Sequence, residues 1–170
     1  MNLNDLTIAT DDLDTASLLK NWRWLITSEV ELLLVTKTGD CFLLDAQTGR
    51  ILFLDTTDGE LEQIAADFEQ FRTVLGDPEF ISDYFSLALL APVIEEPVPK
   101  KAVFALPTPP VLGGSPETDD LSLVDIYDYF DRMGTLWEQL DQIELPEDDM
   151  NGESDEADSE NGSENGSGKK

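Results

Sequence analysis

The stretch that decides the fold runs from Thr36 to Leu75 and reads TKTGDCFLLD, AQTGRILFLD and TTDGELEQIAADFEQFRTVL. Two Thr-Gly pairs stand ten residues apart in it, and each precedes a short apolar run that ends in Leu-Asp. Glycine supplies the positive φ that a tight turn requires, and the runs Cys41–Leu44 and Ile51–Leu54 have the length and composition of strands. The stretch therefore predicts a β-hairpin.

The spacing of the apolar residues changes after Asp58-Gly59. From there to Leu75 they recur every three or four residues, which predicts one face of an amphipathic helix. A strand meander followed by such a helix is expected to pack the helix against the sheet. The predicted helix face consists of Leu61, Ile64, Ala65, Phe68, Phe71 and Leu75.

The length of 170 residues and an apolar content of 41% allow one domain with a proper core. We predict a single α+β domain over residues 1–146, with a central, largely antiparallel sheet and flanking helices. Residues 147–170 consist mostly of Gly, Ser, Asn, Glu and Asp, a composition that cannot bury enough surface to order itself. We predict that this acidic tail is disordered.

Further elements follow from the same patterns. Because the strand runs are continuously apolar, we expect both faces of the sheet to be covered. Helices would cover one face, and the N-terminal segment, the C-terminal third or a second copy of the chain would cover the other. Residues 121–130 fit either strand or helix, and their alternation favours a strand. The other expected helices are 14–22, 78–90 and 135–143, and the other expected strands are 32–35 and 102–106.

The formal net charge of −27 restricts the partners of the chain. Nine of the 37 acidic residues and two of the 10 basic residues lie in the tail, which leaves 28 against 8 in the rest. Nucleic acids and anionic membranes are disfavoured, because binding them requires clustered Lys and Arg. The charge favours a cationic partner, and the simpler interpretation is that it only maintains solubility.

The residue inventory argues against common catalytic chemistry. The sequence contains no histidine, which removes His-based triads and the commonest acid–base residue near neutral pH. The single cysteine, Cys41, lies in a strand-like run and is expected to be buried and inert. The residue counts alone do not exclude catalysis by a pair of carboxylates. We predict that the protein is not an enzyme and holds no metal or cofactor. The first residues lack a basic, apolar leader, so a cytoplasmic protein is expected.

Several segments together resemble the C-terminal domain of type VI secretion immunity proteins of the DNase-neutralising kind, which is similar to the SUKH superfamily of toxin-immunity folds. The resemblance spans roughly residues 18–148. It rests on WRWLI at Trp22–Ile26, Leu34-Val35-Thr36, Gly39-Asp40, Phe42, Gly49-Arg50, Phe53-Leu54-Asp55, Gly59, Phe71, Leu75, PPVLGG at Pro109–Gly114, Gly134, Gln139 and Leu145-Pro146.

This resemblance implies an α+β domain that binds and neutralises a cognate toxin without chemistry of its own. We therefore predict an immunity protein whose acidic surface covers a basic toxin or nuclease domain. The alternative is a housekeeping scaffold or regulatory module of the same fold with no toxin partner. The carboxylates predicted to contact the partner, which can also be read as ordinary turn and cap residues, are Asp55, Asp58, Asp119, Asp120 and Asp125.

Overall fold

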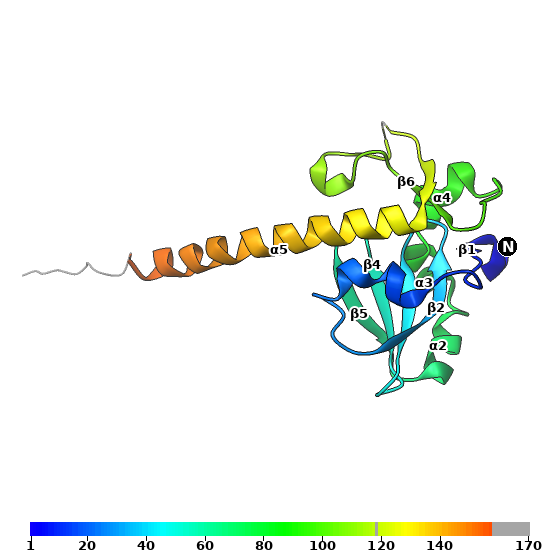
Figure 1. Cartoon of the computed structure of the whole chain (residues 1–170), viewed down its shortest axis with the longest axis horizontal. Coiled ribbons are helices and arrows are strands. Elements are labelled where there is room, and N and C mark those ends of the chain that lie inside the picture. Colours follow the sequence, from blue (N-terminus) through cyan, green and yellow to red (C-terminus); the bar gives the residue numbers. More distant parts are fainter. Residues whose placement is uncertain (118, 158–170) are drawn as a thin grey trace, which may run out of the picture. The chain divides into compact units, whose positions relative to one another are not determined.

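The computed structural model describes residues 1–117 and 119–157, and it confirms the predicted α+β class (Figure 1). The chain divides into two compact units, Met1–Thr135 and Leu136–Lys170. The strands are β1 (Thr7–Ile8), β2 (Val30–Thr36), β3 (Cys41–Asp45), β4 (Ile51–Asp55), β5 (Glu60–Ala65), β6 (Ala102–Ala105) and β7 (Ser122–Asp125). The helices are α1 (Thr15–Leu18), α2 (Phe68–Val74), α3 (Pro78–Tyr84), α4 (Leu87–Leu90) and α5 (Ile126–Ala157), with 3-10 turns η1 (Leu3–Asp5), η2 (Lys20–Trp22), η3 (Ala91–Val93) and η4 (Pro110–Leu112).

Within the described residues, β1 to β5 form one antiparallel sheet in chain order. The predicted hairpin is present as β3 and β4, which place Phe42 opposite Phe53 and Leu43 opposite Leu52. A second, two-stranded sheet pairs β6 with β7. The meander predicted from the Thr-Gly turns is therefore confirmed.

The predicted helix over 61–75 is wrong in its first half. Residues Glu60–Ala65 form β5, which pairs antiparallel with β4, and α2 begins only at Phe68. Asp67 caps α2, since its Oδ1 accepts the backbone N–H of Gln70 at 2.8 Å. A register shift opposite Ile51 and Leu52 breaks the alternation of β5, so its apolar residues imitate helical spacing.

The ambiguous segment 121–130 is divided between two elements. Ser122–Asp125 is the strand β7, and the chain passes directly into α5 at Ile126, so the strand prediction holds for the first half only. The helix predicted over 135–143 is part of α5. The segment predicted as a disordered tail overlaps the end of α5 at 147–157, and 158–170 lie outside the described residues.

One face of the sheet carries an aromatic core. Phe42 is fully buried, and its ring centroid lies 4.9 Å from that of Phe53, 5.4 Å from that of Phe71 and 5.3 Å from that of Phe85. The last two rings come from α2 and the end of α3, so these helices cover this face. Such tilted and stacked ring pairs stabilise the core beyond the area that they bury.

The opposite face is buried as well. Cys41 and Leu43 alternate with Phe42 along β3, and both are fully buried. Besides Leu43 and Leu54 of the sheet itself, the largest buried side chains outside the aromatic core come from the N-terminal segment and from the start of α5. These two segments are joined by a 2.9 Å hydrogen bond from Trp22 Nε1 to the carbonyl of Phe130. The N-terminal segment and the start of α5 therefore cover the second face of the sheet, as the continuously apolar strands led us to expect.

The aromatic core yields a stability prediction. Phe42→Ala is expected to lower the free energy of unfolding by about 3–5 kcal/mol, because it removes a fully buried ring and leaves a cavity. Phe68→Ala is the matched control: its side chain is 53% exposed, and we expect a loss below about 1 kcal/mol. Urea unfolding of both variants tests this, and equal losses would contradict the assignment of the core.

Candidate functional site

Two turns meet at one end of the five-stranded sheet. The turn between β2 and β3 closes through a hydrogen bond from the N–H of Thr36 to the carbonyl of Asp40 at 2.8 Å. Gly39 in this turn has φ +92°, and a Cβ added to it would lie 2.6 Å from the ring of Tyr129 in α5. Both the positive φ and the close approach require glycine.

Thr56, at the start of the turn between β4 and β5, joins the two turns to α5. Its N–H and its hydroxyl donate to Asp40 Oδ1 at 2.9 and 3.0 Å. The hydroxyl also lies 2.9 Å from the carbonyl of Gly39 and 3.1 Å from the hydroxyl of Tyr129. We call Asp40, Thr56 and Tyr129 the Thr56 junction; all three side chains are buried.

The Thr56 junction contains a carboxyl group that prefers to be neutral. Burial, and then the charge of Asp55, raise the pKa of Asp40 to about 8, against the lowering effect of the Thr56 hydrogen bonds. Burial and the nearby Asp58 also raise the pKa of Asp55. Burial, followed by Asp40, raises the pKa of Tyr129 to about 12. At neutral pH Asp40 is therefore largely protonated and Tyr129 retains its proton.

A buried carboxyl with a raised pKa is also a feature of catalytic acids. Here Asp40 Oδ1 is occupied by Thr56, and the Asp40 side chain does not line the neighbouring cavity. The geometry fits a structural tie between the two turns. Burial also raises the pKa of the Cys41 thiol, which is buried as predicted.

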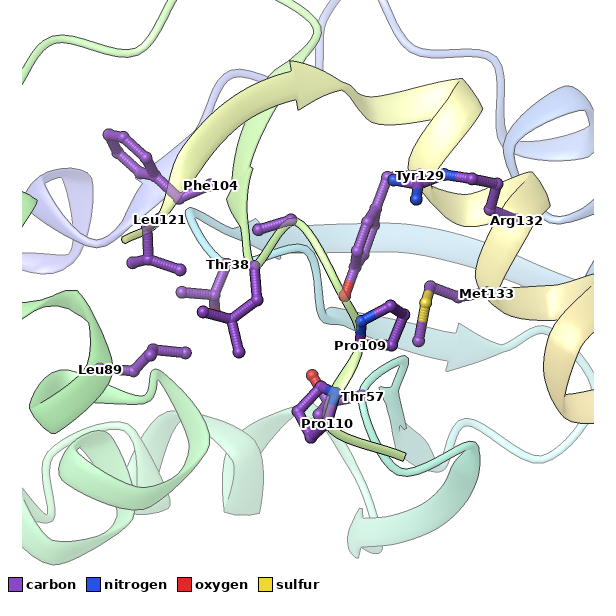
Figure 2. A pocket seen from close by; sticks show the side chains of 12 residues that line it. Thr38, Thr57, Leu89, Phe104, Pro109, Pro110, Leu121, Tyr129, Arg132 and Met133 are labelled. Carbon is purple, nitrogen blue, oxygen red and sulfur yellow. The ribbon is translucent and has the colours of Figure 1, made fainter. Parts of the chain in front are cut away.

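A small apolar cavity lies beside the Thr56 junction (Figure 2). About 50 Å³ of it is open to the centres of water molecules, which is room for a few waters or one aliphatic side chain. Tyr129, Arg132 and Met133 line it from α5, and Leu89 lines it from α4 (Figure 2). The remaining apolar lining is Phe104, Ala105, Leu106, Pro109, Pro110 and Leu121.

A wider hollow of about 340 Å³ adjoins the cavity, because Leu89 and Leu121 line both. Its lining includes the three carboxylates Glu96, Asp119 and Asp120, and its other lining residues are apolar. We call the cavity and the hollow together the Leu89–Leu121 groove. The groove combines an apolar cavity with a hollow that carries carboxylates, and the hollow is its wide end.

The PPVLGG loop contributes an exposed apolar edge to the groove. Pro109 and Pro110 line the cavity, and the next two residues, Val111 and Leu112, are 42% and 58% exposed. The loop is held close to itself at Gly114, where any Cβ would overlap the carbonyl of Thr108. The loop therefore presents apolar side chains from a fixed backbone.

The structure brings some of the predicted partner-binding carboxylates together. Asp119 and Asp120 line the wide end of the groove, although Asp119 Oδ2 also accepts the N–H of Ser115 at 3.0 Å. Asp55 and Asp58 share the β4–β5 turn, where Asp55 Oδ1 accepts the N–H of Asp58 at 2.9 Å. Thr57 of this turn lines the cavity.

Asp125, the fifth predicted residue, has a local role. Its Oδ1 accepts the N–H of Asp128 at 3.0 Å in the first turn of α5, which is an N-cap arrangement. Sequence reasoning missed Glu96, and it missed the Thr56 junction. No local signal marks either, because each depends on segments that are distant in the chain.

Metal sites and membrane spans are not found in the part of the chain that the structure describes. No cluster of three or more His, Cys, Asp or Glu side chains there has the geometry to hold a metal ion. None of its helices combines the length and apolarity that a membrane span needs.

Comparison with known proteins found no matching family model and no matching curated protein. The geometry of the groove and of the Thr56 junction therefore carries the functional argument, together with the sequence resemblance.

The raised pKa of Asp40 predicts a pH-dependent stability. Because the folded state holds this proton more tightly than the unfolded chain, where the pKa is near 3.8, its stabilising effect is complete below about pH 4. The effect is lost as pH rises to about 8, a change on the order of 5 kcal/mol. Asp40→Asn cannot ionise, so its free energy of unfolding should fall less over this range.

Urea unfolding of wild type and Asp40→Asn between pH 4.5 and 8.5 measures this difference. We expect near-equal stability at the acid end and a more stable variant at the basic end. Asp11→Asn, at an exposed position, serves as the control and should parallel wild type. Parallel curves for wild type and Asp40→Asn would contradict a protonated Asp40.

The close approach of Gly39 to Tyr129 predicts a large effect of one methyl group. Gly39→Ala and Gly49→Ala both place alanine at positive φ, which costs about 1 kcal/mol. Only Gly39→Ala also meets Tyr129, because nothing lies within 4 Å of a Cβ at Gly49. We expect Gly39→Ala to be less stable than Gly49→Ala by at least about 1 kcal/mol in thermal unfolding. Equal losses would show that Tyr129 does not pack on this turn.

Proposed function

We propose that this chain is an immunity-type binding protein of the cytoplasm that has no chemistry of its own and neutralises a basic toxin, such as a nuclease. It would do so by covering the substrate-binding cleft of the toxin, which must be basic to hold nucleic acid. The observation that carries the proposal is the Leu89–Leu121 groove, which combines an apolar cavity with an acidic hollow on a chain of net charge −27. The resemblance to DNase-neutralising immunity domains supports the same conclusion.

In such a complex, charge mainly sets the association rate and apolar burial mainly sets the lifetime. Long-range attraction steers the encounter and raises the association rate toward ~10⁸ M⁻¹s⁻¹ at low salt. A stable complex of this class buries about 1,600 Å² in total, and a few desolvated anchors determine its lifetime. The exposed Val111 and Leu112 next to the groove are suited to contribute to such a centre.

Co-expression with the product of the gene adjacent to its own in the native host tests the proposal. We expect the chain to rescue growth from that product and to form a complex with it. The matched control is the Phe42→Ala variant, which should rescue less in proportion to its lost stability. Absence of both rescue and complex would contradict the proposal, and capture of regulatory or metabolic proteins instead would favour a module without a toxin partner.

Salt provides a second test of the same complex. The association rate constant is expected to fall at least about tenfold between 50 and 500 mM NaCl, while the dissociation rate changes little. Stopped-flow or surface binding kinetics measure both rates. An association rate that does not respond to salt would exclude charge steering by the acidic chain.

A further inference from the structure

We infer that the Leu89–Leu121 groove is the docking site for a partner segment in which one aliphatic side chain, Leu or Met, is adjacent to a Lys or Arg. The aliphatic side chain enters the cavity beside Tyr129, and the cation lies between Glu96 and Asp120 at the wide end. This inference rests on the proposed function for the identity of the partner as a toxin, but the chemistry of the segment follows from the groove itself.

The size of the cavity selects the anchor. The volume open to water centres is about 50 Å³, which corresponds to three or four waters and thus to a Leu or Met side chain rather than an indole ring. Its lining includes four aliphatic side chains, those of Leu89, Leu106, Leu121 and Met133. An aliphatic side chain placed there removes apolar surface from water on both partners.

The charges of the groove fix the position of the cation. Glu96 and Asp120 are exposed carboxylates of the hollow, which Asp119 lines as a third carboxylate. The ion pairs found in the described part of the chain, Lys20–Asp131 and Lys100–Asp12, use neither of them. A partner that covers the hollow would bury both carboxylates, which is unfavourable unless it supplies a positive charge.

The narrow end differs, because Arg132 stands at the edge of the cavity. A basic side chain is therefore disfavoured there and favoured at the wide end, and this polarity sets the direction of the segment. The two prolines that line the cavity and the tight contact at Gly114 restrict the backbone of the loop. Little ordering entropy of the loop is then lost when a segment docks in the cavity.

Other occupants fit less well. A second copy of the chain would bring another net charge of −27 to an acidic groove, and anionic lipid headgroups would be repelled in the same way. The carboxylates at the wide end and the apolar cavity together require a partner that is basic and aliphatic. A segment of a basic protein has both properties.

Titration of the ¹⁵N-labelled full chain with the peptide Ser-Gly-Ser-Leu-Arg-Gly-Ser, capped at both ends, tests the chemistry directly. We expect saturable amide shifts at Leu89, Glu96 and Leu121, with a Kd below about 1 mM. Replacing Leu in the peptide by Ser or Trp should weaken binding at least tenfold. Replacing Arg by Gln should do the same.

The matched protein variants keep the fold intact because they change exposed side chains. Glu96→Gln/Asp120→Asn should weaken peptide binding at least tenfold, whereas Glu31→Gln/Glu69→Gln, on β2 and α2, should leave it within twofold. No saturable shifts, shifts centred on another surface, or equal effects of the two double variants would overturn the inference.

The two proposals fail separately. If the Glu96→Gln/Asp120→Asn variant still rescues growth in the co-expression assay, docking in the groove is refuted, whereas the immunity function is not. If the peptide binds specifically at the groove but the chain neither rescues growth nor forms a complex, the immunity function is refuted, whereas docking in the groove is not.

Discussion

The hydroxyl of Thr56 lies within hydrogen-bonding distance of groups from two other segments of the chain, and the shape of the candidate groove depends on this arrangement. It reaches the carbonyl of Gly39 and the carboxyl of Asp40 in one turn and the hydroxyl of Tyr129 in α5. These bonds hold the start of α5 against the end of the sheet. Tyr129 and Met133 are thereby placed where they form a wall of the cavity. A change that moves α5 at this point therefore changes the groove as well.

The same junction shows how a strongly acidic chain keeps a carboxyl in its interior. An ionised Asp40 would stand near Asp55 and Asp58, and all three charges would repel one another. Protonation removes one of these charges at the site where desolvation is greatest. No other acidic residue among 1–117 and 119–143 is buried, so water screens these charges and a cationic partner can relieve their repulsion. Both the protonation of the one buried carboxyl and the exposure of the others follow from the cost of removing a charged carboxylate from water.

Local patterns predicted the centre of the fold well. The turns at Gly39 and Gly49 and the apolar runs beside them indicated β3 and β4, because strand length, turn residues and composition agree there. The local patterns failed at two places. At β5, a register shift against β4 gives a strand the apolar spacing of a helix, and at Ile126 a strand passes into a helix without a glycine or proline. Residues 60–65 form a strand because they pair with β4, and a local sequence pattern does not show which strands pair.

The candidate site was less accessible to sequence reasoning. Asp119 and Asp120 were found because they follow the PPVLGG loop, but the groove forms only when they meet Leu89 and Glu96 from a different segment. We propose that the protein acts by docking a basic partner in this groove. Hydrogen–deuterium exchange of the full chain, alone and bound to the protein that co-purifies from the native host, tests this most directly. Protection concentrated at residues 88–96 and 119–124 is the predicted result, and protection confined to other surfaces would contradict the account.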